Sequence, residues 1–278
     1  AEKYLHADET TVQVLNEVNR KNTATSYMWV YASGKYGTAH PIRLFEYQPG
    51  RSGKYPQEFL KGFQGYLHTD AYAGYNKVMG ITRCFCWSHV RRDFIDALPE
   101  PMNDAEGTLA KHAIEQINRL FSLEREFEPL DANERKKQRL LQVKPVIEAF
   151  WSWIESHKAK VLPKSKLGKA MQYAENQRKG LEAFLEDGNC NVSNNLAENS
   201  IRPFTIGRKN WLFSGSPKGA AASAAVYSLI ETCKANGINE YKYLKYLFES
   251  LPNVPFQRET ALLESYLPWN ETIQQACR

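Results

Sequence analysis

The order of hydrophobic and polar positions divides this chain into a first part with strand character, a helical middle and a mixed last part. In the first hundred residues, short runs rich in aromatic and β-branched residues are separated by glycine and proline turns, a pattern typical of strands. It predicts strands over residues 3–14, 27–31, 42–47, 66–69 and 81–87, and helices over about 52–63 and 89–98. Strands that alternate with helices in this way indicate an α/β domain.

Residues 105–187 carry only a helical pattern, because their apolar residues recur every three or four positions. Three such stripes are separated by Pro129 and Pro163. A stripe of this kind is most simply the buried face of a helix in a bundle, and a cofactor-binding box is the less favoured interpretation. The middle of the chain is therefore predicted to be an all-helical unit that interrupts the α/β domain.

The last part begins where Asp187, Gly188 and Asn189 break the helical pattern. A polar loop leads into a helix that carries Glu198, and Pro203 is expected to end or kink this helix within about two turns. Further helices are predicted over residues 219–236 and 241–250. We therefore expect an α/β domain in two parts, residues 1–100 and 191–250, with a helical insertion domain over residues 101–190 and a C-terminal tail over residues 251–278.

Composition limits the classes of protein to consider. Hydrophobic residues make up 42% of the chain, which is enough for a sizeable core, and no apolar run is long enough to span a membrane. The net charge of +5 is too small to indicate a nucleic-acid partner by itself. Five cysteines in no disulfide pattern favour a reducing cytoplasm. Because the chain starts without Met and without a cap or turn, we interpret it as a fragment of a longer protein.

Three carboxylates stand out as candidates for chemistry. Asp8 lies in an otherwise apolar and aromatic strand, where a carboxylate is costly unless it is paired, binds a metal or faces solvent. Asp70 ends a short strand and has a helix N-cap as its simplest alternative role, and Glu198 forms a possible capping box with Asn195. Together they offer hard oxygen ligands for one or two Mg²⁺ ions, for which Mn²⁺ can substitute. Such a site can cut and join phosphodiesters.

The residues after Glu198 favour a DNA contact. Between Asn199 and Ile230 the chain has no Asp or Glu, and basic side chains near such a site are expected to bind phosphate. The candidate DNA-binding residues are Arg202, Arg208, Lys209, Trp211 and Lys218. Trp211 and Phe213 can also be core residues, and for Phe213 we expect the core.

A Cys-x-x-His pair, Cys86 and His89, follows the strand after Asp70. Structural zinc usually takes four ligands, and no second ligand pair lies nearby in the sequence, so zinc is not expected in this chain. From the residues alone, the pair is interpreted as a helix start with a buried thiol beside it.

Several of these residues lie in blocks that resemble one protein family. The sequence resembles the transposases of the insertion sequence 66 family, a branch of the DDE transposases, in which two Asp and one Glu form the active site. The resembling blocks occur in family order along nearly the whole chain. They are His6–Thr10, Thr69–Tyr75, Cys86–Arg92, Asn194–Asn199, Gly207–Phe213 and Leu267–Asn270. One departure is Asn199, which stands where many relatives have Arg.

The resemblance implies an RNase H-like core with a mixed five-stranded sheet, interrupted by the helical insertion. It places Asp8 on the first strand, Asp70 at the end of the fourth and Glu198 on a later helix. It also implies that His89 and Cys86 form a second shell close to this site, as an alternative to a helix start with a buried thiol. It implies a metal-dependent enzyme that hydrolyses phosphodiesters at transposon ends and transfers the strand into target DNA. Double-stranded DNA, a homodimer or higher assembly, and a bacterial cytoplasm with nucleoid association follow from it. A nuclease without strand transfer and an inactive DNA-binding derivative are the alternatives.

Overall fold

The computed structural model describes residues 2–99 and 107–278. Its backbone contacts group into two compact units. Unit 1 comprises residues 1–6 and 56–196, and unit 2 comprises residues 7–55 and 197–278. Within the described part of the chain, no helix combines the length and the apolar character needed to cross a membrane.

The strands form a six-stranded mixed sheet with the hydrogen-bonded order β3-β2-β1-β4-β5, and β6 adds to β1. Their bounds are β1 Tyr4–Val14, β2 Thr25–Ser33, β3 Arg43–Gln48, β4 Gly65–Thr69, β5 Ile81–Phe85 and β6 Phe213–Ser214. The five predicted strands are therefore confirmed. The two-residue β6 was not predicted, because it is too short to carry an alternating pattern. β1, β4 and β5 run parallel, whereas β2 and β3 are antiparallel.

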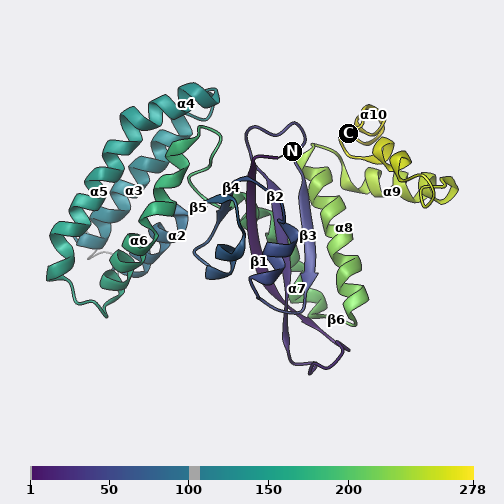
Figure 1. The fold of residues 1–278 in the computed structure, drawn as a ribbon, viewed down its shortest axis with the longest axis horizontal. Coiled ribbons are helices and arrows are strands. Elements are labelled where there is room, and N and C mark those ends of the chain that lie inside the picture. The colour runs from purple at the N-terminus through teal and green to yellow at the C-terminus, as the bar shows by residue number, and fades with distance from the viewer. Residues whose placement is uncertain (1, 100–106) are drawn as a thin grey trace. The chain divides into compact units, whose positions relative to one another are not determined.

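Unit 1 contains the parallel pairs β1–β4 and β4–β5 and a group of helices. The helices are α2 Trp87–Asp96, α3 Leu109–Glu126, α4 Ala132–Gln138, α5 Lys144–His157 and α6 Lys166–Glu182, and the short α1, Lys54–Phe59, begins at the unit's edge. Figure 1 shows α2, α3, α5 and α6 side by side. Most residues of the predicted helical stripes face one core, which residues of α2 and β5 join, but Leu140 and Leu141 of the second stripe are exposed. The aromatic centre of this core is formed by Trp87, Phe94, Phe150, Trp151 and Trp153.

Local sequence explains where several of these helices begin. Thr108, Asp131 and Ser165 stand at the N-caps of α3, α4 and α6, and each side chain accepts a hydrogen bond from a backbone N–H of the first turn. Such caps satisfy amide groups that have no partner inside the helix. Between α4 and α5 the chain forms one π-helical turn, Arg139–Val143.

Unit 2 packs two long helices against the antiparallel strands. These are α7, Asn195–Trp211, which starts at the end of unit 1, and α8, Pro217–Ala235. Apolar residues of β1, β2 and β3 share a core with Ala197, Ile201 and Phe204 of α7. Pro203 was predicted to end or kink α7, but the helix continues to Trp211. Its apolar face is held by this core on both sides of the proline, and packing of this kind outweighs the cost of one missing helical hydrogen bond.

The edge strand β3 is covered by α8, which lies alongside it in Figure 1. The Ser228 hydroxyl accepts a hydrogen bond from Phe45 N at 2.7 Å. The Thr232 hydroxyl accepts from Arg43 N and donates to Arg43 O, both at 3.0 Å. Side chains of α8 therefore satisfy backbone groups of β3 that no further strand pairs.

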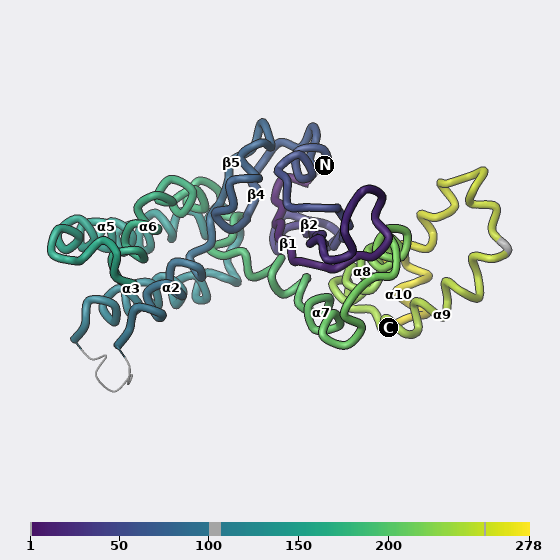
Figure 2. The backbone as a smooth tube through the Cα atoms, turned by 90° about the horizontal axis from the view of Figure 1, so that it is seen from below, coloured from purple at the N-terminus to yellow at the C-terminus, as the bar shows by residue number. Residues whose placement is uncertain are grey.

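The last helices of unit 2 form a smaller core of their own. α9 covers Glu240–Ser250 and α10 covers Glu271–Cys277. The chain between them leaves α9 and then returns, so that α10 lies beside α9 (Figure 2). Cys233, Ile238, Tyr243, Ile273 and Cys277 are buried between these elements. The predicted helices over residues 219–236 and 241–250 thus match α8 and α9 closely.

Candidate active site and its surroundings

Asp8 lies on β1, in the part of the strand that belongs to unit 2. Its side chain is half-buried, and its Oδ1 accepts a hydrogen bond from Glu9 N at 2.9 Å. Alternation along the strand places Ala7 in the core. The neighbouring Glu9 carboxylate is already paired with the Arg51 guanidinium at 2.6 Å, so that charge is compensated. Asp8 therefore combines partial access to solvent with a rigid strand.

Asp70 directly follows β4 in unit 1 and is half-buried. Its Oδ1 accepts a hydrogen bond from Tyr72 N at 2.9 Å, which closes a turn of the Asx type. Its carbonyl accepts from Arg83 Nη2 at 2.7 Å, which ties the strand end to β5. The next helical turn is the 3₁₀ element Ala73–Lys77. The carboxylate bonds to a residue before that turn, so the predicted alternative of a helix N-cap is wrong.

Glu198 is the fourth residue of α7 and lies in unit 2. Its side chain is half-buried in the first helical turn, where a carboxylate is favoured by the helix dipole. α7 begins at Asn195, and the predicted Asn195–Glu198 capping box stays an alternative role for this carboxylate. Coordination of a metal by Asp8, Asp70 and Glu198 together stays a prediction.

Two stacked histidines organise the polar segment before α7. The rings of His6 on β1 and His68 on β4 lie 4.2 Å apart with an interplanar angle of 13°. His6 Nδ1 lies 3.0 Å from Asn194 Oδ1, and His6 Nε2 lies 3.3 Å from Asn191 Oδ1. His68 Nε2 accepts a hydrogen bond from Asn191 N at 2.8 Å. Burial, and then the neighbouring His6, lower the pKa of His68 well below its usual value, so this imidazole is neutral.

This histidine pair was missed by sequence analysis. Its only local signal is that each histidine stands two residues before a candidate aspartate, His6 before Asp8 and His68 before Asp70. In a strand, two residues is the spacing of neighbours on one face. The pairing of His6 with His68 in the β1–β4 register brings the two rings together, which a single sequence does not reveal.

Cys86 and His89 both lie at the start of α2. Cys86 is buried, and its Sγ accepts a hydrogen bond from Asn194 N at 3.2 Å, which helps to fix the chain just before α7. His89 is half-buried in the first turn of α2. Burial raises the pKa of Asp93, one turn further along, and the charge of His89 opposes that rise. Cys86 therefore has a structural contact of its own, and the predicted role of both residues as a second shell remains untested.

The polar segment before α7 begins at Asp187, whose carboxylate makes several hydrogen bonds. Its Oδ2 lies 3.0 Å from Lys3 Nζ and 2.8 Å from Tyr4 Oη, and its Oδ1 accepts from Asn189 N. Burial alone would raise the pKa of Asp187, but these hydrogen bonds hold it below its usual value. The segment from Asp187 to Asn194 is thus bonded to β1 and β4 along its length.

The candidate DNA-binding residues differ in their surroundings. Arg202, Lys209 and Lys218 are exposed. Arg208 is half-buried, and its guanidinium donates to the Thr10 hydroxyl at 3.0 Å and to the backbone of Thr11, so it joins α7 to β1. Only the first three therefore present their full charge to solvent.

The two aromatic residues after this stretch also differ. The indole of Trp211 is half-buried against Phe204, with ring centroids 5.3 Å apart. Phe213 is 45% exposed, so its predicted place in the core is wrong. It lies on the two-residue β6, where β1 supplies backbone pairing but no apolar cover for the ring.

Comparisons with known proteins agree with this arrangement of motifs. The family described as "Transposase IS66 family" matches residues 1–222, which contain Asp8, Asp70 and Glu198. The chain belongs to the IS66 transposase family. A second match, to the "IS66 C-terminal element", covers residues 228–269, which include α9.

Relatives of this IS66 family chain are found in Sinorhizobium fredii (strain NBRC 101917 / NGR234). The uncharacterized protein y4qI is 32% identical over 277 residues, covering 95% of this chain and 50% of that protein. The uncharacterized protein y4hP is 29% identical over 287 residues, covering 97% of this chain and 51% of that protein. The chain thus spans about half the length of the curated relatives it matches. No solved structure matches it significantly.

Proposed function

We propose that this chain is the catalytic core of a DDE transposase and that Asp8, Asp70 and Glu198 form its active site. The observation that carries the proposal is the IS66 family match over residues 1–222, within which all three carboxylates lie in resembling blocks. Their positions support it, because they stand on β1, directly after β4 and in the first turn of α7. The mixed strand order supports an RNase H-like core, in which the helices α3 to α6 form the insertion.

The three side chains have the donor chemistry that Mg²⁺ or Mn²⁺ requires. All three offer carboxylate oxygens, and each is half-buried, so each keeps a surface that a hydrated ion and DNA can reach. Backbone N–H groups of Glu9 and Tyr72 orient the two aspartates. When bound, such ions lower the pKa of an attacking water and stabilise the charge on the leaving oxygen.

The proposed reaction has two steps. Water attacks the phosphodiester at a transposon end, which releases a 3′-OH and leaves a 5′-phosphate. The 3′-OH then attacks a phosphodiester of the target, so one bond forms for each bond that breaks and no covalent protein intermediate is needed. Both steps demand a site that holds DNA phosphates, and the exposed Arg202, Lys209 and Lys218 supply positive charge for this.

The partners follow from this reaction. The substrate is double-stranded DNA, both as transposon ends and as target. Joining two ends to one target requires two active sites, so we propose a homodimer or a higher assembly on DNA. The place of action is the bacterial cytoplasm, at the nucleoid.

The test uses the full-length transposase and duplexes that carry the ends of its own insertion sequence. We expect Mg²⁺-dependent cleavage, followed by strand transfer into a plasmid, and loss of both with Asp8→Asn, Asp70→Asn or Glu198→Gln. The matched control is Glu249→Gln on α9, an exposed glutamate that should leave both steps unchanged. Cleavage without joining would instead identify a nuclease. Binding without cleavage in the wild type would identify an inactive DNA-binding derivative.

A further inference from the structure

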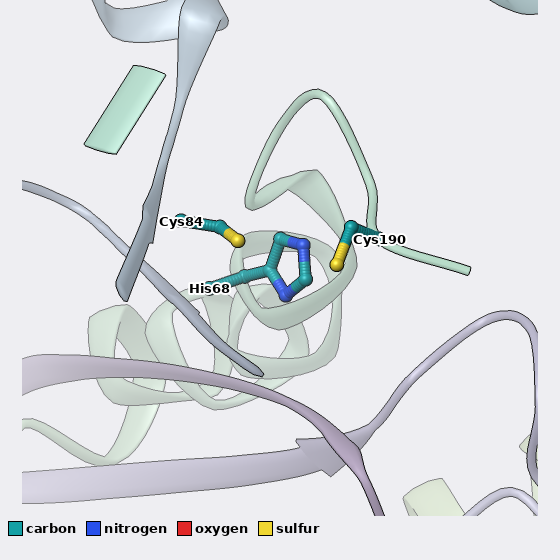
Figure 3. A group of neighbouring side chains, drawn as sticks. All are labelled: His68, Cys84 and Cys190. Carbon is teal, nitrogen blue, oxygen red and sulfur yellow. The ribbon is translucent and has the colours of Figure 1, made fainter. Parts of the chain in front are cut away.

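Three potential metal ligands other than the candidate carboxylates meet inside unit 1. The donor atoms of His68, Cys84 and Cys190 all lie within 4.8 Å of one another, and Figure 3 shows the imidazole and the two thiols turned toward one another. His68 on β4 and Cys84 on β5 are direct partners in the parallel strand register. Cys190 comes from the segment between α6 and α7. All three residues are buried, so the cluster is shielded from water.

The hydrogen bonds of His68 define which ring nitrogen can bind a cation. Nδ1 lies 3.2 Å from Leu5 O. A carbonyl oxygen only accepts, so Nδ1 carries the hydrogen and Nε2 carries the lone pair. A metal-binding histidine typically donates its other N–H to a backbone carbonyl in this way, which fixes the ring. Nε2 now accepts a hydrogen bond from Asn191 N, and a bound cation would replace this single contact.

The charge balance around the cluster also suits a cation held by thiolates. Arg139 donates to Cys190 O at 2.9 Å, and its own charge is paired with Glu124 at 2.7 Å. The pair is therefore neutral as a whole. The side-chain hydrogen bond with Cys84, and then burial, raise the pKa of the Cys190 thiol, and the Arg139 charge opposes that rise. Two thiolates and one divalent cation add no net charge to the interior.

We propose that His68, Cys84 and Cys190 bind one zinc ion through Nε2 and two thiolates. Binding releases the two thiol protons to solvent and forms two Zn–S bonds and one Zn–N bond. The ion joins β4 and β5 to the segment that leads into α7. This site is independent of the proposed transposase chemistry, because it uses soft sulfur and imidazole donors in place of carboxylates.

Zinc was not expected from the sequence, because Cys84 was considered only beside Cys86 and His89, and Cys190 and His112 were only loose candidates for further ligands. The three residues proposed here come from distant segments, and only the β4–β5 register and the return of the chain before α7 bring them together. Spacing rules apply to ligand pairs on one loop and miss a site of this construction.

The experiment measures zinc in the purified, fully reduced chain after chelation and reloading. We expect about one zinc per chain, with two sulfur ligands and at least one nitrogen ligand in the zinc X-ray absorption spectrum of the wild type. Cys84→Ser and Cys190→Ser should lose the ion. The matched control Cys233→Ser, a buried cysteine of unit 2, should retain it, as should Asp70→Asn.

Three results would overturn the proposal. The first is a wild type that holds no zinc after reloading. The second is zinc whose absorption spectrum shows only oxygen and nitrogen neighbours, a result that does not depend on any variant being folded. The third is a disulfide between Cys84 and Cys190 that survives the reducing treatment, which mass spectrometry would detect.

Discussion

The buried Arg139 offers the sharpest test of what holds unit 1 together. It lies in the π-helical turn between α4 and α5 and is 1% exposed. Its guanidinium makes two bonds to the Glu124 carboxylate, at 2.8 and 2.7 Å. Further bonds reach the carbonyls of Phe184, Asp187 and Cys190, at 3.2, 3.1 and 2.9 Å. All five donors of the side chain are thus in use.

We expect Arg139→Met to lower the free energy of unfolding of unit 1 by about 4–6 kcal/mol. Breaking a buried ion pair costs about 3–5 kcal/mol, because the Glu124 carboxylate is left without its partner. Three carbonyls also lose a bond worth about 1 kcal/mol each, part of which water restores. Adding Glu124→Gln should recover part of the loss, because it removes the unpaired charge. The control Lys144→Met breaks an exposed pair with Glu148 and should cost about 0.5 kcal/mol or less.

The assay is urea unfolding followed by amide hydrogen exchange in peptides of unit 1, since a chain of two units need not unfold in one step. The reasoning is refuted if Arg139→Met shifts the midpoint of unit 1 no more than Lys144→Met does. It is also refuted if the variant that carries both Arg139→Met and Glu124→Gln is no more stable than Arg139→Met alone.

Three further predictions concern steric room at Gly188, the pH dependence of stability and the salt dependence of DNA affinity. Gly188→Ala should destabilise unit 1 by about 3 kcal/mol, measured by urea unfolding, because the added Cβ overlaps the carbonyl of Ala132. The pKa of Asp187 is lower in the folded chain than in the unfolded chain, where it is about 4. Asp187 therefore stabilises the folded state above about pH 4, and this stability is lost as the pH falls through the folded pKa. Melting temperatures of Asp187→Asn should therefore be lower at pH 7 and fall less on acidification; parallel curves would contradict this. Lys209→Ala and Lys218→Ala should each reduce the salt dependence of DNA affinity by about one ion, measured by fluorescence anisotropy, and an unchanged slope would exclude a phosphate contact.

Local pattern was enough to predict most elements of this fold. Strands with alternating apolar residues were found within a few positions, and α8 and α9 were predicted almost residue for residue, because turns and caps mark their ends. The errors occurred where tertiary packing, and not the local pattern, decides where a helix ends or whether a side chain is buried. Pro203 does not end α7, since Ile201 and Phe204 anchor the helix on both sides, and Phe213 is exposed on the two-residue β6.

In the candidate site, too, some residues could be found from the sequence and others only from the structure. Asp8, Asp70 and Glu198 are visible in the sequence because Asp8 lies within a recognisable strand, Asp70 follows one and Glu198 lies in the first turn of a recognisable helix. The stacked imidazoles of His6 and His68 depend on strand register, for which one sequence carries no signal. Long-range partners of this kind become visible only when the strands are placed in order.

The cover that α8 provides for β3 has a consequence for assembly. An edge strand with unused amide groups is a template on which another chain can add a strand. The outward N–H groups of Arg43 and Phe45 are already occupied by hydroxyls of the same molecule. A second copy therefore cannot extend the sheet through these two N–H groups at its β3 edge. Ser228 and Thr232 thus protect the β3 edge from strand addition by another chain.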